Sequence, residues 1–339
     1  MQRRMQPGPL LDSTGRLIDP GYATAEVRHY DRAMVRASGW RIKEWDYYCI
    51  QTDACALALT VADNGYLGFL GLSWIDLEQG SAINHGAVRP FPFGRMRLPA
   101  SADSGSIDQR QGKVRIAFEQ RPGERRLTFA APGFDRGRGL SGEVVLRQPD
   151  DDRMVIATPF PDAPRAFYYN QKLNCLPAAG AVTLGDQRIT FDPASAFAVL
   201  DWGRGVWTYD NTWFWASASG LHQGRRIGFN IGCGFGDTSA ASENMLFLDG
   251  RAHKLDQVTW HVPEGPLDGA PWHFTSSDGR FEMRFDPVVD RHDTVDLGLF
   301  RTSQHQVFGR FSGTATCDDG TVLEIAGLTG FAERVHNRW

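Results

Sequence analysis

The sequence predicts an all-β protein made of two consecutive antiparallel β-barrels that arose by an internal duplication. Three observations lead to this fold class. Apolar residues recur with a period of two far more often than at helical spacing, turn dipeptides separate the alternating stretches, and the two halves of the chain can be aligned on one another. The chain has 339 residues, which is enough for two domains with a sizeable core.

Alternating stretches bounded by Gly, Asp and Pro occur in both halves of the chain. Four clear examples are KVRIAF at residues 113–118, RRLTF at 125–129, RFEMRF at 280–285 and VLEIAGL at 322–328. Pairs such as Asn64-Gly65 and Asp278-Gly279 mark tight hairpins, because Gly and Asn adopt positive φ angles at little cost. The predicted arrangement is a meander of antiparallel strands.

Matches between the two halves occur in one order and at slowly drifting offsets. Residues 67–69 match 227–229 at an offset of 160, and the hairpin at 118–129 matches 274–285 at an offset of 156. Each unit then holds enough strands to close into a barrel, and closure removes exposed sheet edges.

The join between the units is expected at the Pro-dense stretch PFPDAP, residues 159–164, because proline cannot continue a central strand. The predicted organisation therefore has three parts. They are an N-terminal extension over residues 1–20, a first barrel over 21–162 that serves as scaffold, and a second barrel over 163–339 that holds a ligand site.

The charge and the apolar runs exclude several classes of protein. Lys and Arg number 36 and Asp and Glu 40, so the net charge of −4 lacks the positive excess that a general nucleic-acid binder needs. Apolar runs are far shorter than a membrane-spanning helix, and the N-terminus lacks the apolar centre of a signal peptide. We expect a cytoplasmic protein with free cysteines, no nucleic-acid partner and no integral membrane segment.

Familiar catalytic signatures are absent from the sequence. The motifs of serine hydrolases, zinc proteases and P-loop proteins do not occur, and the nine histidines are scattered. The glycine-rich residues 232–236 lack the βαβ frame of a dinucleotide loop and are more typical of a strand with Gly where side chains would crowd. We therefore expect no cofactor and no metal site.

Polar and aromatic residues concentrate in the middle of the chain. In the stretch NQKLN, the side chains of Asn170, Lys172 and Asn174 lie on one face of an extended strand, because side chains alternate. That face is either an exposed outer surface or the wall of a polar ligand site. The next stretches, DWGRGVWTY and NTWFW, add further candidates: Asp201, Trp202, Arg204, Trp207, Tyr209, Trp213 and Trp215.

The aromatic-rich segment permits two interpretations. It is either a packed plug in which Arg204 stacks on Trp and pairs with Asp201, or an aromatic-walled pocket that holds one acid and one base. In the second interpretation Asp201 is a candidate proton donor.

The second half supplies Asn230, Glu243 and Asn244. In the alignment of the halves, Leu70 and Ile83 take the places of Asn230 and Glu243, so polar groups replace packing residues only in the second barrel. This difference is why the ligand site is predicted there. Asn244 has a counterpart in the first half and is better interpreted as a turn or strand-end residue, although it stays a candidate ligand contact.

The chain ends in the sequence ERVHNRW, which we expect to pack back as a final strand. Glu333 and Arg338 in this stretch are candidates for a salt bridge, which is the favoured interpretation, or for the rim of the pocket.

Several of these motifs resemble a known family. NQKxN at residues 170–174, DWxRGxW at 201–207, GFNxG at 228–232, EN at 243–244 and the closing HNRW resemble the bacterial domain of unknown function 2804 family. The resemblance extends from about residue 21 onward and implies no particular activity. More remotely, the layout is similar to the lipocalin-like (calycin-like) tandem barrels of the carotenoid hydratase type, a similarity of architecture only.

A small barrel without a metal or nucleotide suits proton-driven chemistry on an apolar or amphipathic small molecule. We predict a cofactor-free hydratase, lyase or isomerase with Asp201 and Glu243 as catalytic acids, in which indole faces stabilise positive charge and Asn or Lys groups hold an oxygen. A non-catalytic carrier protein is the first alternative, and carbohydrate binding or processing is the second.

Overall fold

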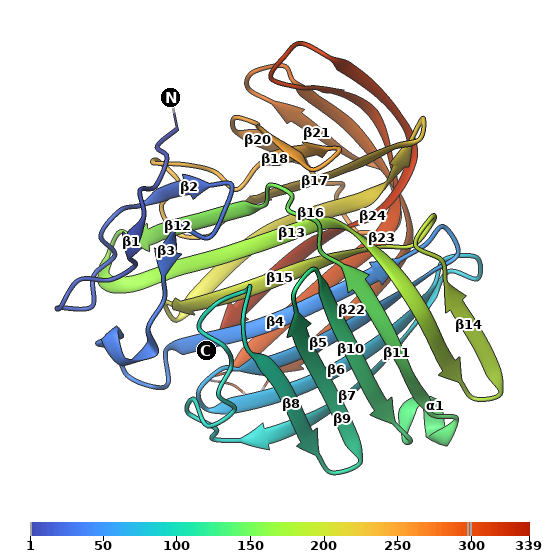
Figure 1. Ribbon diagram of the computed structural model, residues 1–339, viewed down its shortest axis with the longest axis horizontal. Helices are drawn as coiled ribbons and strands as arrows, with labels where there is room; N and C mark the ends of the chain where they lie inside the picture. The colour runs from blue at the N-terminus through green and yellow to red at the C-terminus, as the bar shows by residue number, and fades with distance from the viewer. Residues whose placement is uncertain (1, 297, 299) are drawn as a thin grey trace.

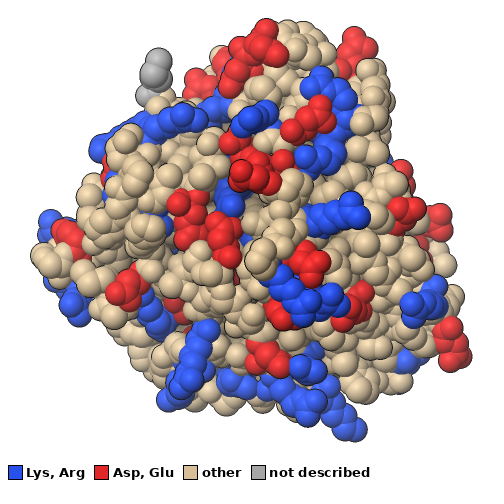
Figure 2. Space-filling view, viewed as in Figure 1, with Lys and Arg blue, Asp and Glu red and all other residues tan. Residues whose placement is uncertain are grey.

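The computed structural model describes residues 2–296, 298 and 300–339 and consists of two curled antiparallel sheets that form barrel-like units (Figure 1). The predicted all-β, lipocalin-like fold class is confirmed. Helical structure in the described residues is limited to η1 (Arg32–Met34) and α1 (Phe134–Gly137). None of the described helices is long and apolar enough to cross a membrane. Acidic and basic side chains are interspersed over the face shown in Figure 2.

The first sheet contains most strands of the N-terminal part of the chain. Its strands are β2 (Gly21–Ala23), β4 (Ile42–Gln51), β5 (Cys55–Asp63), β6 (Leu67–Asp76), β7 (Ser81–Pro90), β8 (Ser106–Gln111), β9 (Val114–Arg121), β10 (Glu124–Ala131), β11 (Leu140–Arg147), β12 (Met154–Phe160), β13 (Ala163–Leu184), β14 (Gln187–Phe191) and β15 (Phe197–Val206). The main order is β7-β6-β5-β4-β15-β13-β11-β10-β9-β8. Short strands β1 (Gly8–Pro9) and β3 (Arg28–His29) pair separately in parallel.

The second sheet contains all later strands. They are β16 (Asp210–His222), β17 (Arg225–Cys233), β18 (Met245–Leu248), β19 (Arg251–Lys254), β20 (Val258–His261), β21 (Trp272–Ser276), β22 (Phe281–Asp296), β23 (Arg301–Thr316) and β24 (Val322–Arg338). Their order is β19-β18-β17-β16-β24-β23-β22-β21-β20. Each sheet therefore begins with a four-strand meander, and the chain then crosses to the far edge and returns to pair with the first strand of that meander.

The predicted join at residue 162 does not coincide with the change of sheet. Strands β13 to β15 complete the first sheet, and the second sheet begins only at Asp210. Pro161 lies instead in the turn between β12 and β13, and Pro159 and Pro164 lie in the adjoining strand ends, where the register shifts between Pro159 and Phe160. Proline is compatible with such a turn because the turn does not need its missing N–H.

The alignment of the two halves agrees with the structure in one part and departs from it in another. The hairpin β9–β10 and its predicted counterpart β21–β22 occupy the same place in the strand order of their sheets. Residues 67–69, however, lie in the third strand of their meander, whereas residues 227–229 lie in the second. Leu70 and Asn230 therefore do not occupy equivalent positions, and the duplication itself stays a prediction.

Two apolar cores stabilise the fold. One lies inside the second sheet and includes Ala216, Phe229 and Phe311, while the other fills the first sheet and extends to residues between the sheets such as Trp215 and Phe331. Strand alternation explains the division, because Trp215 and Ala216 are neighbours on β16 and point to opposite faces.

Candidate functional site

A buried polar cluster lies between the two sheets. β13 of the first sheet packs against β16 and β17 of the second. We call the residues that meet there the intersheet cluster: Tyr168, Asn170, Lys172, Asp201, Trp215, Asn230, Glu243 and Glu333, all of them buried. The sequence placed this site inside the second barrel, but the second sheet encloses an apolar core and the polar candidates lie on its outer face.

Lys172 and Asp201 form the charged pair of the intersheet cluster. They are cross-strand neighbours on β13 and β15, and the Nζ of Lys172 lies 2.8 Å from Oδ2 of Asp201. The Nδ2 of Asn170 donates a hydrogen bond of 2.6 Å to Oδ1 of the same carboxylate. The Lys172 ammonium also lies 3.7 Å from the ring centroid of Trp215, a cation–π contact. Asp201 thus has both oxygens occupied and fixes the position of the ammonium.

Glu243 is a buried acid that forms no ion pair with a described residue. It precedes β18 and is 2% exposed, and its polar side-chain neighbours are the Tyr168 hydroxyl and the Asn230 amide. Burial raises its pKa to about 7, although the nearby Lys172 ammonium acts in the opposite direction. Gly232 makes room for this carboxyl, because a Cβ there would lie 2.0 Å from Oε1 of Glu243.

Asn230 connects Glu243 to the aromatic part of the intersheet cluster. Its Oδ1 accepts a hydrogen bond of 2.7 Å from Nε1 of Trp215, and its Nδ2 donates one of 2.9 Å to the backbone oxygen of Glu243. The amide therefore positions the indole and the acid at the same time.

Glu333 on β24 supplies a second buried acid. Nε1 of Trp213 donates to its Oε1 at 3.1 Å and Nε2 of Gln304 donates to its Oε2 at 3.3 Å, and burial raises its pKa to about 7. The favoured salt bridge of Glu333 does not form, since no described cation lies within 4.0 Å of it. Arg338 lies at the surface instead and pairs with Asp210 at 3.3 Å.

Aromatic rings form a wall beside the cluster. Tyr168 stacks on Phe235 with 4.7 Å between ring centroids, and Trp207 contacts Trp213 at 5.2 Å and Trp339 at 6.0 Å. The buried Tyr168 hydroxyl lies beside the Glu243 carboxyl. Burial and the nearby carboxyl groups raise the pKa of the Tyr168 phenol, so it stays protonated.

Trp202 and Arg204 lie on the opposite face of β15, inside the first sheet. The Arg204 guanidinium lies 4.1 Å from the Trp202 ring centroid, as the plug interpretation expected, but its Nη2 pairs with Asp46 at 2.8 Å and not with Asp201. The reason is strand geometry, because residues 201 and 204 are three apart and point to opposite faces. These two candidates are separated from the intersheet cluster.

The remaining predicted residues lie outside the intersheet cluster. Asn174 donates hydrogen bonds to Ser217 and to the backbone of Phe229, next to the cluster. Asn244 accepts from the backbone of Gly232 and donates to that of Asp256, which agrees with the strand-end interpretation. Tyr209 lies between the guanidinium groups of Arg41 and Arg338, 5.7 and 5.8 Å from its ring centroid.

Two members of the cluster were missing from the predicted site. Tyr168 could have been found, because it shares the alternating face of Asn170 and Lys172. Glu333 was noticed only as a salt-bridge or rim candidate, and no local signal places it beside Lys172, since β24 is far from β13 in sequence. Among the described residues, no group of three or more His, Cys, Asp or Glu side chains is arranged to hold a metal ion.

The fold and this site define a two-unit lipocalin-like protein with a buried acid–base cluster between the units. The chain belongs to the DUF2804 family, a domain of unknown function whose family model matches residues 1–339. No curated protein matches the chain.

The solved structures that are similar to this chain have low sequence identity to it. A putative AttH (NE1406) from Nitrosomonas europaea has a TM-score of 0.55 and 15% identity, over 92% of this chain and 98% of its own. CghA has a TM-score of 0.52 and 11% identity, over 98% of this chain and 97% of its own. Kievitone hydratase from Nectria haematococca has a TM-score of 0.48 and 11% identity, over 88% of each chain.

Proposed function

We propose that this protein binds an apolar or amphipathic small molecule against the aromatic wall and catalyses a cofactor-free proton transfer at Glu243. The observation that carries the proposal is the state of that carboxyl group. Glu243 is buried, forms no ion pair with a described residue and has a pKa of about 7. A carboxyl with these properties exists in both protonation states near neutral pH, so it suits general acid–base catalysis.

The chemistry that fits is the addition or elimination of water, or the shift of a double bond. Protonated Glu243 transfers its proton to one carbon of a substrate double bond, whose π electron pair forms the new C–H bond. The neighbouring carbon becomes cationic and is attacked by water, which then returns a proton to the Glu243 carboxylate. Loss of a proton from another carbon, without water, isomerises the double bond.

The neighbours of Glu243 support this assignment. Lys172 is held in place by Asp201 and supplies a fixed ammonium for a substrate oxygen, while the π faces of Trp213 and Phe235 suit developing positive charge. Asp201 was predicted as a second catalytic acid. Because both its oxygens are engaged by Lys172 and Asn170, its role in this proposal is to position Lys172.

The buried tryptophans favour an apolar ligand over a sugar. Trp207 and Trp215 are 2% and 3% exposed, whereas a carbohydrate platform needs flat indole faces open to solvent. A carrier protein would use the same aromatic wall without the proton transfer, so the experiment must separate binding from chemistry.

The test combines binding and deuterium incorporation. A panel of unsaturated fatty acids, isoprenoids and oligosaccharides is first screened by quenching of tryptophan fluorescence. Ligands that bind are then incubated with the protein in D2O, where proton transfer to carbon introduces deuterium detectable by mass spectrometry. We expect Glu243→Gln to abolish the incorporation while binding persists, because the amide keeps the shape but has no transferable proton.

Glu324→Gln is the matched control, since Glu324 is exposed on the same second sheet. This variant is expected to behave like the wild type. Quenching without deuterium incorporation in the wild type would show a carrier, and a response to oligosaccharides alone would reject the apolar ligand.

A further inference from the structure

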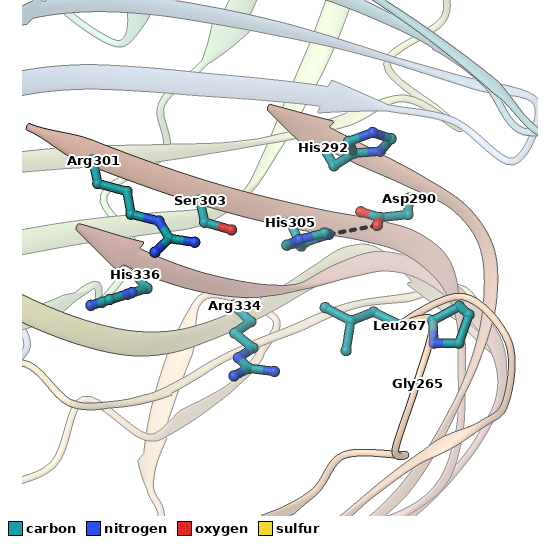
Figure 3. Close-up of a pocket in the computed structure, with 10 residues that line it drawn as sticks. Gly265, Leu267, Asp290, His292, Arg301, Ser303, His305, Arg334 and His336 are labelled. Atoms are coloured by element: carbon teal, nitrogen blue, oxygen red, sulfur yellow. Dashed lines mark hydrogen bonds and ion pairs between the residues drawn. The ribbon is translucent and has the colours of Figure 1, made fainter. Parts of the chain in front are cut away.

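A cavity of about 480 Å³ opens on the inner face of the second sheet (Figure 3). Its lining residue Arg334 follows Glu333 on β24, so these two side chains point to opposite faces. Polar residues from the ends of three long strands line it: His292, Arg301, Ser303, His305, Arg334 and His336. Leu267 forms an apolar part of its wall. None of these residues belongs to the intersheet cluster.

The strand register brings these side chains together. His292 on β22 pairs with His305 on β23, and His305 pairs with Arg334 on β24, so two imidazoles and a guanidinium form one row across the sheet. Ser303 and His336 form the next row. Cross-strand neighbours on one face have Cβ atoms about 5 Å apart, so one small ligand can contact several of these groups.

A bulge on β22 gives His292 its orientation. The register shifts between Pro287 and Val289, and after it Val289 packs into the core between the sheets whereas Asp290 and His292 face the cavity. Bulges of this kind redirect side chains. Deeper along β23, the same inner face carries Val307, which belongs to the apolar core. The polar rows are therefore confined to the mouth of the sheet.

Cationic groups converge in this cavity and only some of them are paired with acids. The Arg334 guanidinium has no hydrogen bond or ion pair with any described residue, and Arg301 has only an exposed contact of 3.8 Å with Asp296. Nε2 of His336 lies 2.9 Å from Oδ1 of Asp210, which is not a lining residue. Asp290 is the single acid among the lining residues, and its Oδ2 lies 2.7 Å from Nδ1 of His305. This contact holds the ring of His305, so its Nε2 is left to interact with a ligand.

We propose that the mouth of the second sheet is a binding site for a small oxyanion, the phosphate or carboxylate group of an organic molecule whose apolar part contacts Leu267. Guanidinium groups bind such anions through paired, charge-assisted hydrogen bonds, and the imidazoles add further donors. The concave wall excludes bulk water from part of the ligand and strengthens the attraction.

Isothermal titration calorimetry with inorganic phosphate and, separately, with succinate tests the site on the full-length protein. We expect one of the two anions to bind with 1:1 stoichiometry and with an affinity that falls as NaCl is raised. The anion that binds identifies the phosphate or the carboxylate as the recognised group. Arg334→Gln is expected to weaken that binding at least about tenfold, because it removes a charge-assisted contact.

Arg284→Gln is the control, because Arg284 lies on β22, is exposed and pairs with Asp286 outside the cavity. His292→Gln is a second, independent variant and should also weaken binding. The proposal is overturned if neither anion binds the wild type, or if Arg284→Gln reduces the affinity as much as Arg334→Gln does.

Discussion

Glu243 illustrates how surroundings give one side chain its chemistry. The same residue type at Glu324 is exposed, whereas Glu243 is enclosed by Gly232, Asn230 and the aromatic wall. Removing a carboxyl from water disfavours its charged form, and the ammonium groups of Lys172 and Lys254 only partly offset that cost. The lack of a Cβ at Gly232 is what allows the carboxyl to approach the backbone of β17 so closely.

The raised pKa of Glu243 predicts a pH dependence of folding. Its pKa rises from the usual 4.5 to about 7 on folding. Between these values the unfolded chain releases the proton while the folded protein retains it, so the free energy of unfolding falls as the pH rises. Below the lower value both states are protonated and the full stability is present. The resulting loss of unfolding free energy amounts to about 3 kcal/mol and is complete above the pKa of Glu243 in the folded protein.

The measurement is urea unfolding of the wild type and of Glu243→Gln from pH 4.5 to 8. The difference in unfolding free energy between the two proteins should change across this range, because glutamine does not titrate. Titration of Glu333 changes the unfolding free energy of both proteins in the same direction, so its contribution cancels in the difference between them. Parallel stability curves for the two proteins would contradict the assignment.

At the scale of the element, β15 separates two polar systems. Asp201 faces the intersheet cluster, while Arg204 faces the interior of the first sheet, where it pairs with Asp46. Both ion pairs are buried, yet only the first lies beside Glu243. The alternation of one strand therefore places one charged residue at the candidate site and another in the packed core.

The two faces of β15 predict different effects of substitution. Arg204→Met leaves Asp46 buried without its partner and should lower the free energy of unfolding by about 3–5 kcal/mol with little change in ligand affinity. Asp201→Asn frees Lys172 and should change the affinity for the ligand found in the fluorescence screen.

Urea unfolding and fluorescence titration of both variants provide the comparison. Arg165→Gln is a suitable control, because Arg165 is exposed near the start of β13. If Arg204→Met alters ligand affinity as strongly as Asp201→Asn does, the two faces do not act separately.

At the scale of the whole molecule, the first sheet depends on strands that follow the Pro-dense hairpin. β13 and β15 connect β11 to β4, so without them no strand pairing joins the meander of β4 to β7 to strands β8 to β11, and only side-chain hydrogen bonds such as those from Arg89 to β8 remain. The same two strands carry the first-sheet half of the intersheet cluster, so closure of the first sheet and assembly of the candidate site require the same segment.

This dependence predicts how fragments behave. A fragment of residues 1–162 lacks the linking strands and should show no cooperative thermal unfolding, whereas a fragment of residues 1–208 retains the complete first sheet and should unfold more cooperatively. Circular dichroism and limited proteolysis of the two fragments measure the difference. Equal cooperativity would favour the boundary predicted at residue 162.

The sequence by itself determined the all-β class, the family and one face of the candidate site. Period-two patterns and turn pairs are local, so the strands and the shared face of Asn170, Lys172 and Asn174 follow from them. The position of that face was decided only by tertiary structure. Whether a strand face meets solvent, a barrel interior or a second sheet depends on pairing between distant segments, such as β24 with β16. The packing of the two sheets brings Glu333 near Lys172, and the register of β23 with β24 places Arg334 beside His305, which no local pattern encodes.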